Sequence, residues 1–330
     1  MKLSLSLRLA AAAAGAYLAA ASLPAHAADA AYPSKPVTII VPFGAGGVAD
    51  AIPRIVGQKL NEMWGVPVII ENRPGASGNL GMGQVARAAA DGYTLGLAPA
   101  GNLTVNPLLY TNLNFDTAQA FAPVTLLATS PNILVVNPSV PAKDFKSFVA
   151  YAKTRPGKLN FASPGAGSGA HLAGELLNQS AGLSTMHIPY NGMAPAVTDV
   201  VAGNVDMMFA GVSTVLPFIR GGKLNALAIA GPHRLPQLPD VPTVAESGYP
   251  GFDVTSWYGI VAPAKTPAAV LQKIQRDIAT VLQDPAVRQK FADQGVEPAS
   301  TSTQEFAAMI QNESRKWADI VKTAGIKPIQ

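Results

Sequence analysis

Short apolar runs rich in β-branched residues alternate along the chain with longer segments in which apolar residues recur at helical spacing. The first three runs lie at residues 37–41, 66–70 and 94–98. Between the first two runs, the residues repeating at helical spacing are Ile52, Ile55, Val56 and Leu60. A strand repeats its pattern every second residue and a helix about every 3.6 residues, so this alternation predicts strand-helix-strand units.

Further strands are predicted at residues 133–136, 159–162, 186–189, 205–210, 224–230 and 257–262. Because most of these runs are apolar throughout, we expect mainly parallel strands that are covered on both faces. Near the C-terminus, residues 267–282 and 304–324 each carry an apolar stripe that predicts a helix. Asp284-Pro285 indicates where another helix begins between them.

Two segments, residues 121–136 and 224–251, lack a long helix between neighbouring strands. We interpret both as crossings between two α/β lobes. The crossings divide the chain into a first lobe of residues 28–127 with 230–330 and a second lobe of residues 128–229. A chain that crosses twice leaves a cleft between its lobes, where ligands are usually held.

The first 27 residues have the pattern of a secretory signal peptide. Lys2 and Arg8 precede an apolar run at 9–23, which ends at Pro24-Ala25-His26-Ala27 with small residues at the −3 and −1 positions. The run is too short and too rich in alanine for a stable membrane span. We therefore expect cleavage after Ala27, although a buried N-terminal helix would be the alternative interpretation. The chain has no cysteine, which argues against a lipid-anchored cleavage site, disulfides and thiolate metal sites.

Composition narrows the choice of partners. Charged residues make up 13% of the chain, and its formal net charge is +4. Without Lys2 and Arg8 this charge falls to +2, with 22 basic residues against 20 acidic ones and no basic run. Nucleic acid is therefore not an expected partner. Beyond Ala28 no apolar run reaches the roughly 18 residues that a membrane span requires.

A glycine-rich turn follows the first predicted strand, at Phe43-Gly44-Ala45-Gly46-Gly47, and opens a helix. Backbone N–H groups at a helix N-terminus attract an anion. The pattern Gly44-x-Gly46-x-x-Ala49 also matches a dinucleotide fingerprint, with Glu71 near the ribose position. Export and the acid Asp50 at the helix opening weigh against a nucleotide, and a tight turn without a ligand is a third interpretation.

A second turn of the same kind spans residues 163–171. Either Ser163 or Ser168 could cap the following helix or donate a hydroxyl to a ligand carboxylate. If one such turn lies in each lobe, both helix N-termini point into one cleft, where backbone amides could hold a carboxylate.

The sequence contains little that supports a catalytic site. Ser168 and His171 are one helical turn apart, yet the sequence around Ser168 is not the Gly-x-Ser-x-Gly nucleophile elbow, and no acid is placed to orient the histidine. His171, His187 and His233 show no metal-ligand spacing. We predict neither cofactor nor metal, and an exported enzyme stays as an alternative.

Three motifs together resemble a known family: Val41-Pro42-Phe43-Gly44-Ala45-Gly46-Gly47-Val48-Ala49-Asp50, Glu71-Asn72-Arg73-Pro74-Gly75-Ala76-Ser77-Gly78-Asn79-Leu80-Gly81, and Ile188-Pro189-Tyr190-Asn191-Gly192-x-x-Pro195-Ala196. Their order and spacing resemble the Bug family, the periplasmic solute-binding receptors of tripartite tricarboxylate transporters, over essentially the whole mature chain. The resemblance implies a type II periplasmic-binding-protein fold, with two α/β lobes, a ligand cleft between them and two crossover strands.

The resemblance also implies capture of a small carboxylated solute without catalysis, and delivery to an integral-membrane transporter or to a sensor protein. We expect a monomer in the periplasm that is open without solute and closed with it, hinged near residues 128 and 229. An exported enzyme acting on a carboxylate and a structural or adhesive protein are the competing interpretations.

Carried onto this chain, the ligand-binding residues of the first lobe are Phe43, Gly44, Ala45, Gly46, Gly47, Asn102 and Thr104. Those of the second lobe are Ser163, Gly167, Ser168, Gly169, Tyr190, Asn191, Ser213 and Thr214. Two departures matter: Gly44-Ala45 stands where many members have Pro-Pro, and Asn191 stands where lysine is frequent. Arg73 could bind a carboxylate or pair with Glu71, and Trp257 is expected in core or hinge packing.

Overall fold

The computed structural model describes residues 32–165, 168–190, 192–323, 325–326 and 328. Residues Lys35–Gln330 form one compact unit, to which the following description applies. The predicted signal peptide, residues 1–27, lies outside the described residues.

A six-stranded mixed sheet forms the centre of the first lobe. Its strands, in spatial order, are β11 (Glu297–Pro298), β4 (Phe121–Ser130), β10 (Ser256–Pro263), β3 (Thr94–Pro99), β1 (Val37–Val41) and β2 (Val68–Asn72). β1 pairs in parallel with β2 and β3, whereas β10 is antiparallel to both β3 and β4.

A five-stranded mixed sheet forms the centre of the second lobe. Its spatial order is β7 (Met186–Pro189), β6 (Asn160–Ser163), β8 (Met207–Gly211), β5 (Asn132–Val136) and β9 (Asn225–Ala230). β6 pairs in parallel with β7 and β8, and β5 is antiparallel to β8 and β9.

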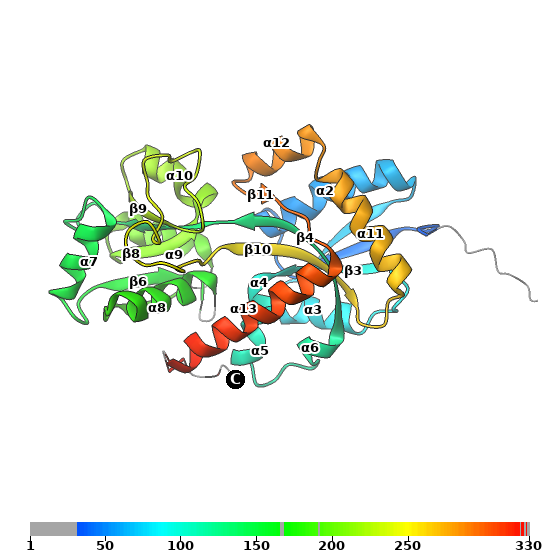
Figure 1. The fold of residues 1–330 in the computed structure, drawn as a ribbon, viewed down its shortest axis with the longest axis horizontal. Helices are drawn as coiled ribbons and strands as arrows, with labels where there is room; N and C mark the ends of the chain where they lie inside the picture. Colours follow the sequence, from blue (N-terminus) through cyan, green and yellow to red (C-terminus); the bar gives the residue numbers. More distant parts are fainter. Residues whose placement is uncertain (1–31, 166–167, 191, 324, 327, 329–330) are drawn as a thin grey trace, which may run out of the picture. The chain divides into compact units, whose positions relative to one another are not determined.

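Helices cover both sheets (Figure 1). In the first lobe they are α2 (Val48–Trp64), α3 (Asn79–Ala86), α4 (Ala100–Thr104), α5 (Asn106–Leu109), α6 (Thr117–Ala120), α11 (Ala268–Val281), α12 (Pro285–Asp293) and α13 (Thr303–Thr323), with a 3-10 turn η1 at Ala76–Gly78. In the second lobe they are α7 (Phe145–Lys153), α8 (Gly169–Ala181), α9 (Met193–Ala202) and α10 (Val212–Arg220). Two sheets with their own helices confirm the predicted two-lobed α/β fold.

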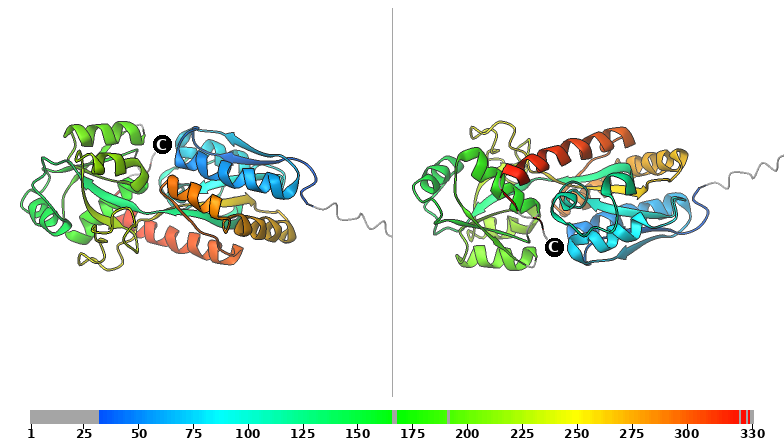
Figure 2. Two further views of the ribbon diagram at one scale, coloured as in Figure 1. Left: turned by 90° about the horizontal axis from the view of Figure 1, so that it is seen from above. Right: turned by 90° about the horizontal axis from the view of Figure 1, so that it is seen from below.

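Each lobe has its own apolar core. In the first lobe, Met82 and Val85 of α3 pack with Phe306 of α13 against one face of the sheet. In the second, Phe145 and Phe148 of α7 belong to the core that also contains α8. The C-terminal end of α13 reaches this second core through Trp317 and Ile320, so one helix contacts both lobes (Figure 2).

The first predicted crossing is confirmed, but the direction of its strands differs from the expectation. Residues 121–136 contain two strands, β4 in the first sheet and β5 in the second, and Pro131 alone separates them. The expectation of mainly parallel strands is wrong for the crossing strands, which are antiparallel to their neighbours. A strand that continues directly into the next sheet has no crossover helix, and parallel pairing of consecutive strands needs one.

The return connection, residues 231–254, packs mainly on the second lobe. Its residues Val244, Phe252 and Val254 lie in the core around α7 and α8, and Leu235 lies in the core around α9 and α10. The chain then enters β10 at Ser256.

Candidate functional site

A cavity of about 510 Å³ lies between the lobes and is lined by residues of both. From the first lobe come Phe43, Gly47, Ala49, Ser77, Pro99, Ala100, Gly101, Asn102, Val105 and Asn106. From the second lobe come Pro164, Gly165, Ser168, Gly169, Leu172, Gly192 and Met193, while Val254, Thr255, Ser256, Trp257, Tyr258 and Trp317 close the remaining wall. This size suits a small organic molecule.

Helix N-termini, rather than charged side chains, face this cavity. Gly47, Gly169 and Met193 lie at the first turns of α2, α8 and α9, which have 17, 13 and 10 residues respectively. Within the described part of the chain, none of the lining residues is Lys, Arg, His, Asp or Glu. The first-turn N–H groups of a helix have no intrahelical acceptor, and the helix dipole adds a partial positive charge there. The cavity can therefore bind an anion with neutral donors.

The side chain of Asp50 anchors the loop that follows β1. Its carboxylate accepts hydrogen bonds from Gly46 N–H at 3.0 Å, Arg54 Nε at 2.9 Å and Asn72 Nδ2 at 2.8 Å. The hydrogen bond from Arg54, aided by those from Gly46 and Asn72, outweighs burial and lowers the pKa of Asp50 to about 2. Asn72 Nδ2 also donates to Phe43 O at 3.0 Å. Asp50 is thus an ionised anchor that fixes the loop.

This anchoring changes the role expected for part of the loop. The Gly46 amide, predicted to face a ligand, donates to Asp50 instead. Phe43 and Gly47 line the cavity, whereas Gly44, Ala45 and Gly46 do not. All five are solvent-exposed.

The loop after β6 is organised by two serines with different positions. Ser168 caps α8, because its Oγ accepts from His171 N–H at 3.3 Å, and it also donates to Gly165 O at 2.7 Å. Ser168 and Gly169 line the cavity. Ser163 is fully buried, donates to Gly165 O at 2.9 Å, and has no surface to offer a ligand. Gly167 lies outside the described residues.

A stacked pair of histidines supports this loop, a feature that the sequence spacing did not indicate. The rings of His171 and His187 stack with centroids 3.8 Å apart, and Phe161 stacks on His187 at 5.0 Å. His187 Nε2 lies 2.6 Å from Ser163 Oγ. Burial lowers the pKa of His171 to about 4, and burial together with the neighbouring His171 lowers the pKa of His187 to about 3. Both rings are therefore neutral at neutral pH.

The other residues carried over from the family occupy mixed positions. Asn102 lines the cavity. Thr104 is buried and its hydroxyl donates to Ala100 O at 2.8 Å, within α4. Tyr190 donates its hydroxyl to Asp199 Oδ2 at 2.6 Å and does not line the cavity. Ser213 and Thr214 lie in α10 and do not line it either, and Asn191 is outside the described residues.

Ser77 lines the cavity although the sequence analysis did not select it. It has φ = 52°, in the left-handed region, and its carbonyl accepts from Asn102 Nδ2 at 2.9 Å and from Asn106 Nδ2 at 3.1 Å. Two asparagines thus hold a strained turn in place. The sequence signal for this turn is the glycine-flanked motif Gly75-Ala76-Ser77-Gly78.

Two ambiguities of the sequence are resolved. Arg73 pairs with Glu71, which was the structural alternative to ligand binding. Trp257 is 1% exposed, packs edge-on against Phe306 with centroids 5.4 Å apart, and donates its indole N–H to Glu313. It is a packing residue at the start of β10, and one of its surfaces also borders the cavity.

Across the described residues, no cluster of three or more His, Cys, Asp or Glu side chains could hold a metal ion. Over the same residues, no helix combines the length and apolar character that crossing a membrane requires.

Comparisons with known proteins agree with this architecture. The model of the tripartite tricarboxylate transporter family receptor matches residues 52–326. Protein BugT of Bordetella pertussis is 36% identical over 314 residues, covering 95% of this chain and 96% of BugT.

Two solved structures from Rhodopseudomonas palustris extend the comparison. Rpa4515 with adipate has a TM-score of 0.81 at 33% identity, covering 90% of this chain and all (100%) of that one. MatC with bound malate has a TM-score of 0.75 at 33% identity, covering 88% and 100% of the two chains. Periplasmic binding proteins of this type share the two-lobed fold described above. The chain belongs to the Bug family, the solute-binding receptors of tripartite tricarboxylate transporters.

Proposed function

We propose that this receptor captures a small carboxylated solute in the cavity between its lobes and delivers it to the membrane subunits of a tripartite transporter. The observation that carries this proposal is the convergence of the N-termini of α2, α8 and α9 on one cavity, whose lining contains no charged residue among those the structure describes. The adipate and malate in the two related structures support a carboxylate as the ligand.

The carboxylate would accept hydrogen bonds from backbone N–H groups on both sides of the cavity. Gly47 would contribute from the first lobe, and Gly169 and Met193 from the second. The amide of Asn102 would add a side-chain contact, and the hydroxyl of Ser168 would do so on releasing its hydrogen bond to Gly165 O. The remaining family positions stay proposed contacts that the solute would reach only if the loops or helices carrying them move: Gly44, Ala45, Gly46, Thr104, Ser163, Gly167, Tyr190, Asn191, Ser213 and Thr214.

We infer that the lobes close on the solute, because the proposed hydrogen-bond donors are divided between the two lobes. A solute that bridges both walls gains its full set of contacts only when the lobes approach, so binding shifts the population towards a closed state. We propose that residues 28–127 and 230–330 form the first lobe and residues 128–229 the second. Within the first-lobe range, the connection 231–254 packs on the second lobe. The crossings near residues 128 and 229 would bend as the hinge.

The cellular setting is part of the same proposal. The family members are periplasmic binding proteins, and the pattern of residues 1–27 supports export followed by cleavage after Ala27. We infer that the mature chain is a monomer without enzymatic activity. A sensor protein in place of the transporter is the alternative partner.

A thermal-unfolding screen of carboxylic acids tests the ligand class. The panel contains monocarboxylates, dicarboxylates, tricarboxylates, aromatic acids and amino acids, each with its primary amide as the matched neutral control. A ligand that binds only the folded state raises the apparent Tm in a concentration-dependent manner. We expect an acid to stabilise the chain while its amide does not.

Three results would contradict the proposal. Equal stabilisation by an acid and its amide would exclude recognition of the carboxylate. Chemical conversion of a bound acid, followed by NMR, would establish the enzyme alternative. An unchanged lobe separation in small-angle scattering, with and without a saturating acid, would refute closure.

A further inference from the structure

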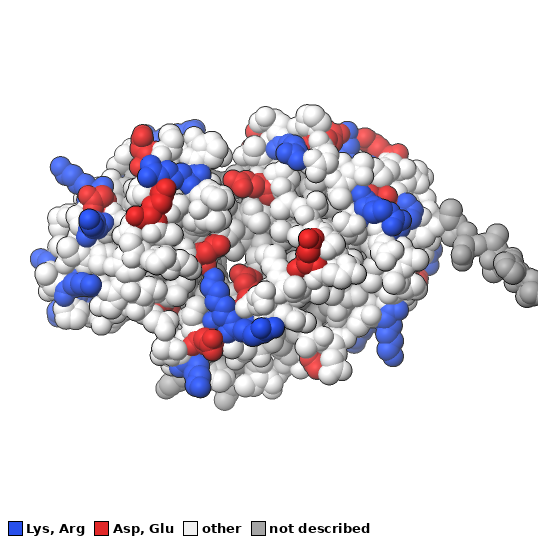
Figure 3. All heavy atoms as spheres, in the orientation of Figure 1, with Lys and Arg blue, Asp and Glu red and all other residues white. Residues whose placement is uncertain are grey.

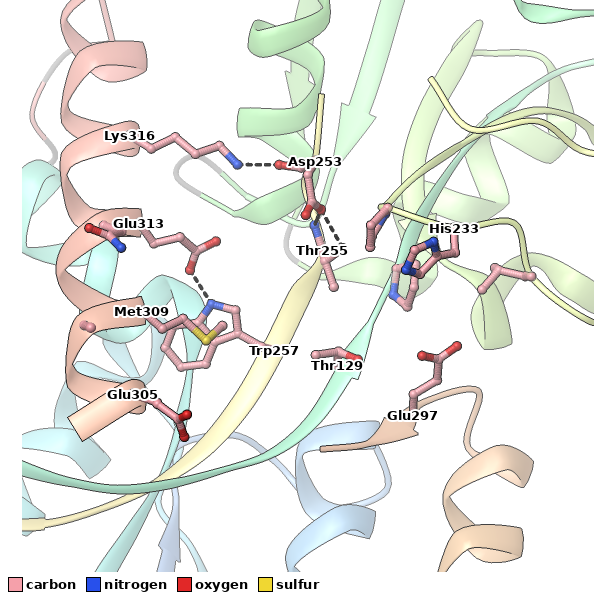
Figure 4. Close-up of a pocket in the computed structure, with 15 residues that line it drawn as sticks. Thr129, His233, Asp253, Thr255, Trp257, Glu297, Glu305, Met309, Glu313 and Lys316 are labelled. Carbon is pink, nitrogen blue, oxygen red and sulfur yellow. Dashed lines mark hydrogen bonds between the residues drawn. The ribbon is translucent and has the colours of Figure 1, made fainter. Parts of the chain in front are cut away.

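A second and larger cavity, of about 670 Å³, borders the crossing strands and α13 (Figure 4). Met309 and Glu313 of α13 form one side of it, and His233 and Leu235 of the return connection form the other. Trp257 and Thr255 line both this cavity and the proposed solute cavity, so the two share a wall. We call the second cavity the hinge groove.

Carboxyl groups dominate the charged groups of the hinge groove. Asp253, Glu297, Glu305 and Glu313 line it, and none of them has an ion-pair partner in the described part of the chain. Among the described residues, the lining contains one lysine, Lys316, whose ammonium donates to the backbone carbonyl of Asp253. The whole chain carries more basic than acidic residues, so this local excess of acid is opposite in sign to the average.

Neutral donors supply the hydrogen bonds to three of these carboxyl groups, and the charge of Lys316 acts on Glu313 in addition. Asp253 Oδ1 accepts from Thr255 N–H at 2.9 Å, and Glu305 Oε2 accepts from Ser302 N–H at 2.8 Å. Glu313 accepts from the Trp257 indole, and burial raises its pKa. Glu297 extends from β11 towards the groove in Figure 4. Figure 3 shows acidic side chains near the middle of this face, with basic side chains among them.

The rest of the groove is apolar. The exposed Pro232 and Ala308 and the half-buried Met309 contribute apolar surface between the carboxylates, whereas Trp257 and Leu235 are buried in the wall. An acidic rim around an apolar floor complements a cation joined to an apolar body. The volume exceeds what a bare ion fills and is enough for several side chains.

We propose that the hinge groove is a docking site for a segment of a partner protein in which lysine or arginine side chains flank an apolar side chain. The apolar side chain would lie against Met309, and the cations would pair with the exposed carboxylates of Glu297 and Glu305. Docking uses residues outside the solute contacts and does not depend on the proposed solute.

The shared wall couples the groove to the solute cavity. If the lobes close around the crossing strands, Trp257 and Thr255 move relative to Leu235 or Met309, and the shape of the groove changes with the state of the cleft. A partner that prefers one shape would change solute affinity, and solute would change partner affinity by the same factor. This coupling rests on the proposed lobe closure, whereas docking itself does not.

The test uses the mature chain and a fluorescein-labelled synthetic peptide of alternating lysine and leucine, titrated by fluorescence anisotropy without solute. Peptides with glutamate replacing lysine, or serine replacing leucine, test each half of the complementarity, and spermidine tests a free cation. We expect saturable binding of the lysine-leucine peptide alone, weakened by added salt as ion pairs between exposed groups are.

The double variant Glu297→Gln with Glu305→Gln should weaken peptide binding by about five- to tenfold, on the scale of two lost exposed ion pairs. Met309→Ser should weaken it at any salt concentration. The matched control is Asp319→Asn, an exposed acid on the same helix α13 that does not line the groove, and it should leave binding unchanged. An unchanged Tm of each variant establishes that it folds.

Several outcomes would overturn docking. These are no binding of the lysine-leucine peptide, equal binding of the glutamate-leucine peptide, and equal loss in the Asp319→Asn control. Binding of spermidine as tight as that of the peptide would show that the groove takes a free polyamine and not a protein segment. A flat carboxylate screen together with positive peptide binding would contradict the proposed function and leave docking intact.

Discussion

Replacing Asp50 with asparagine should loosen the loop after β1. The carboxylate accepts from Gly46, Arg54 and Asn72, and its side chain is 7% exposed. An amide in its place has one oxygen, and its NH2 group would face a donor. We therefore expect Asp50→Asn to lower the free energy of unfolding and to weaken solute binding, because the loop would no longer be preorganised.

The magnitude follows from the pKa of Asp50, which falls from 3.8 to about 2 in the folded chain. Each pKa unit corresponds to about 1.4 kcal/mol, so the ionised carboxylate contributes roughly 2 kcal/mol to the free energy of unfolding near neutral pH. The side chain of Arg54 is 48% exposed, and solvent screening reduces this value. We expect a loss of about 1–2 kcal/mol in the variant.

The sign of the pH dependence is set by the lowered pKa. The stabilisation is fully present above the unfolded pKa and is lost as pH falls through the folded value. Urea unfolding of both chains should therefore give a difference that shrinks to about a third between about pH 6 and about pH 2.5. Glu62→Gln, an exposed acid paired with Lys59 on the same helix, should cost less than about 0.5 kcal/mol. A difference between wild type and Asp50→Asn that is constant with pH would refute the reasoning.

Three further predictions concern the second lobe. Ser168→Ala removes the cap of α8 and should cost about 1 kcal/mol in urea unfolding, together with a loss of carboxylate affinity by titration. Gly174→Ala would place a Cβ 2.3 Å from the ring of Phe161 and should cost about 1–3 kcal/mol in thermal unfolding. The free energy of unfolding of the wild type should fall from about pH 6.5 towards about pH 4, because buried neutral imidazoles protonate on unfolding, and His187→Gln should make this fall shallower.

Each of these has a control or a contradicting result. Ser147→Ala is the control for Ser168→Ala. It removes a serine that takes part in capping α7, and it should leave carboxylate affinity unchanged. Gly101→Ala introduces a Cβ with nothing within 4 Å and should leave the Tm unchanged or slightly raised. If His187→Gln leaves the pH profile unaltered, the stacked pair does not control acid stability.

The sequence predicted the elements better than their pairing. The runs at 37–41 and 186–189 coincide with β1 and β7, and the stripe at 304–324 nearly coincides with α13. The direction of the strands was missed where β4 passes through Pro131 into β5. Apolar runs show that a strand is buried on both faces, but they carry no information on the direction of its neighbours.

The candidate site shows the same limit at the level of residues. The two glycine-rich turns were visible because helix N-termini and glycine follow local rules. The sequence did not predict the burial of Ser163, because its contact with His187 joins strands that lie 24 residues apart in the chain. The sequence likewise predicted Gly46 as a ligand donor, whereas the geometry of its turn directs its N–H to the carboxylate of Asp50.

The sequence by itself therefore determined the alternation of strands and helices, the two turns with free helix N-termini and the family. These depend on residues close together in the chain. Only the tertiary structure decided which amides face the cavity, which histidines support the second loop, and that Trp257 separates the solute cavity from an acidic groove. Those features arise where distant segments meet, and their contacts are set by packing that no local pattern contains.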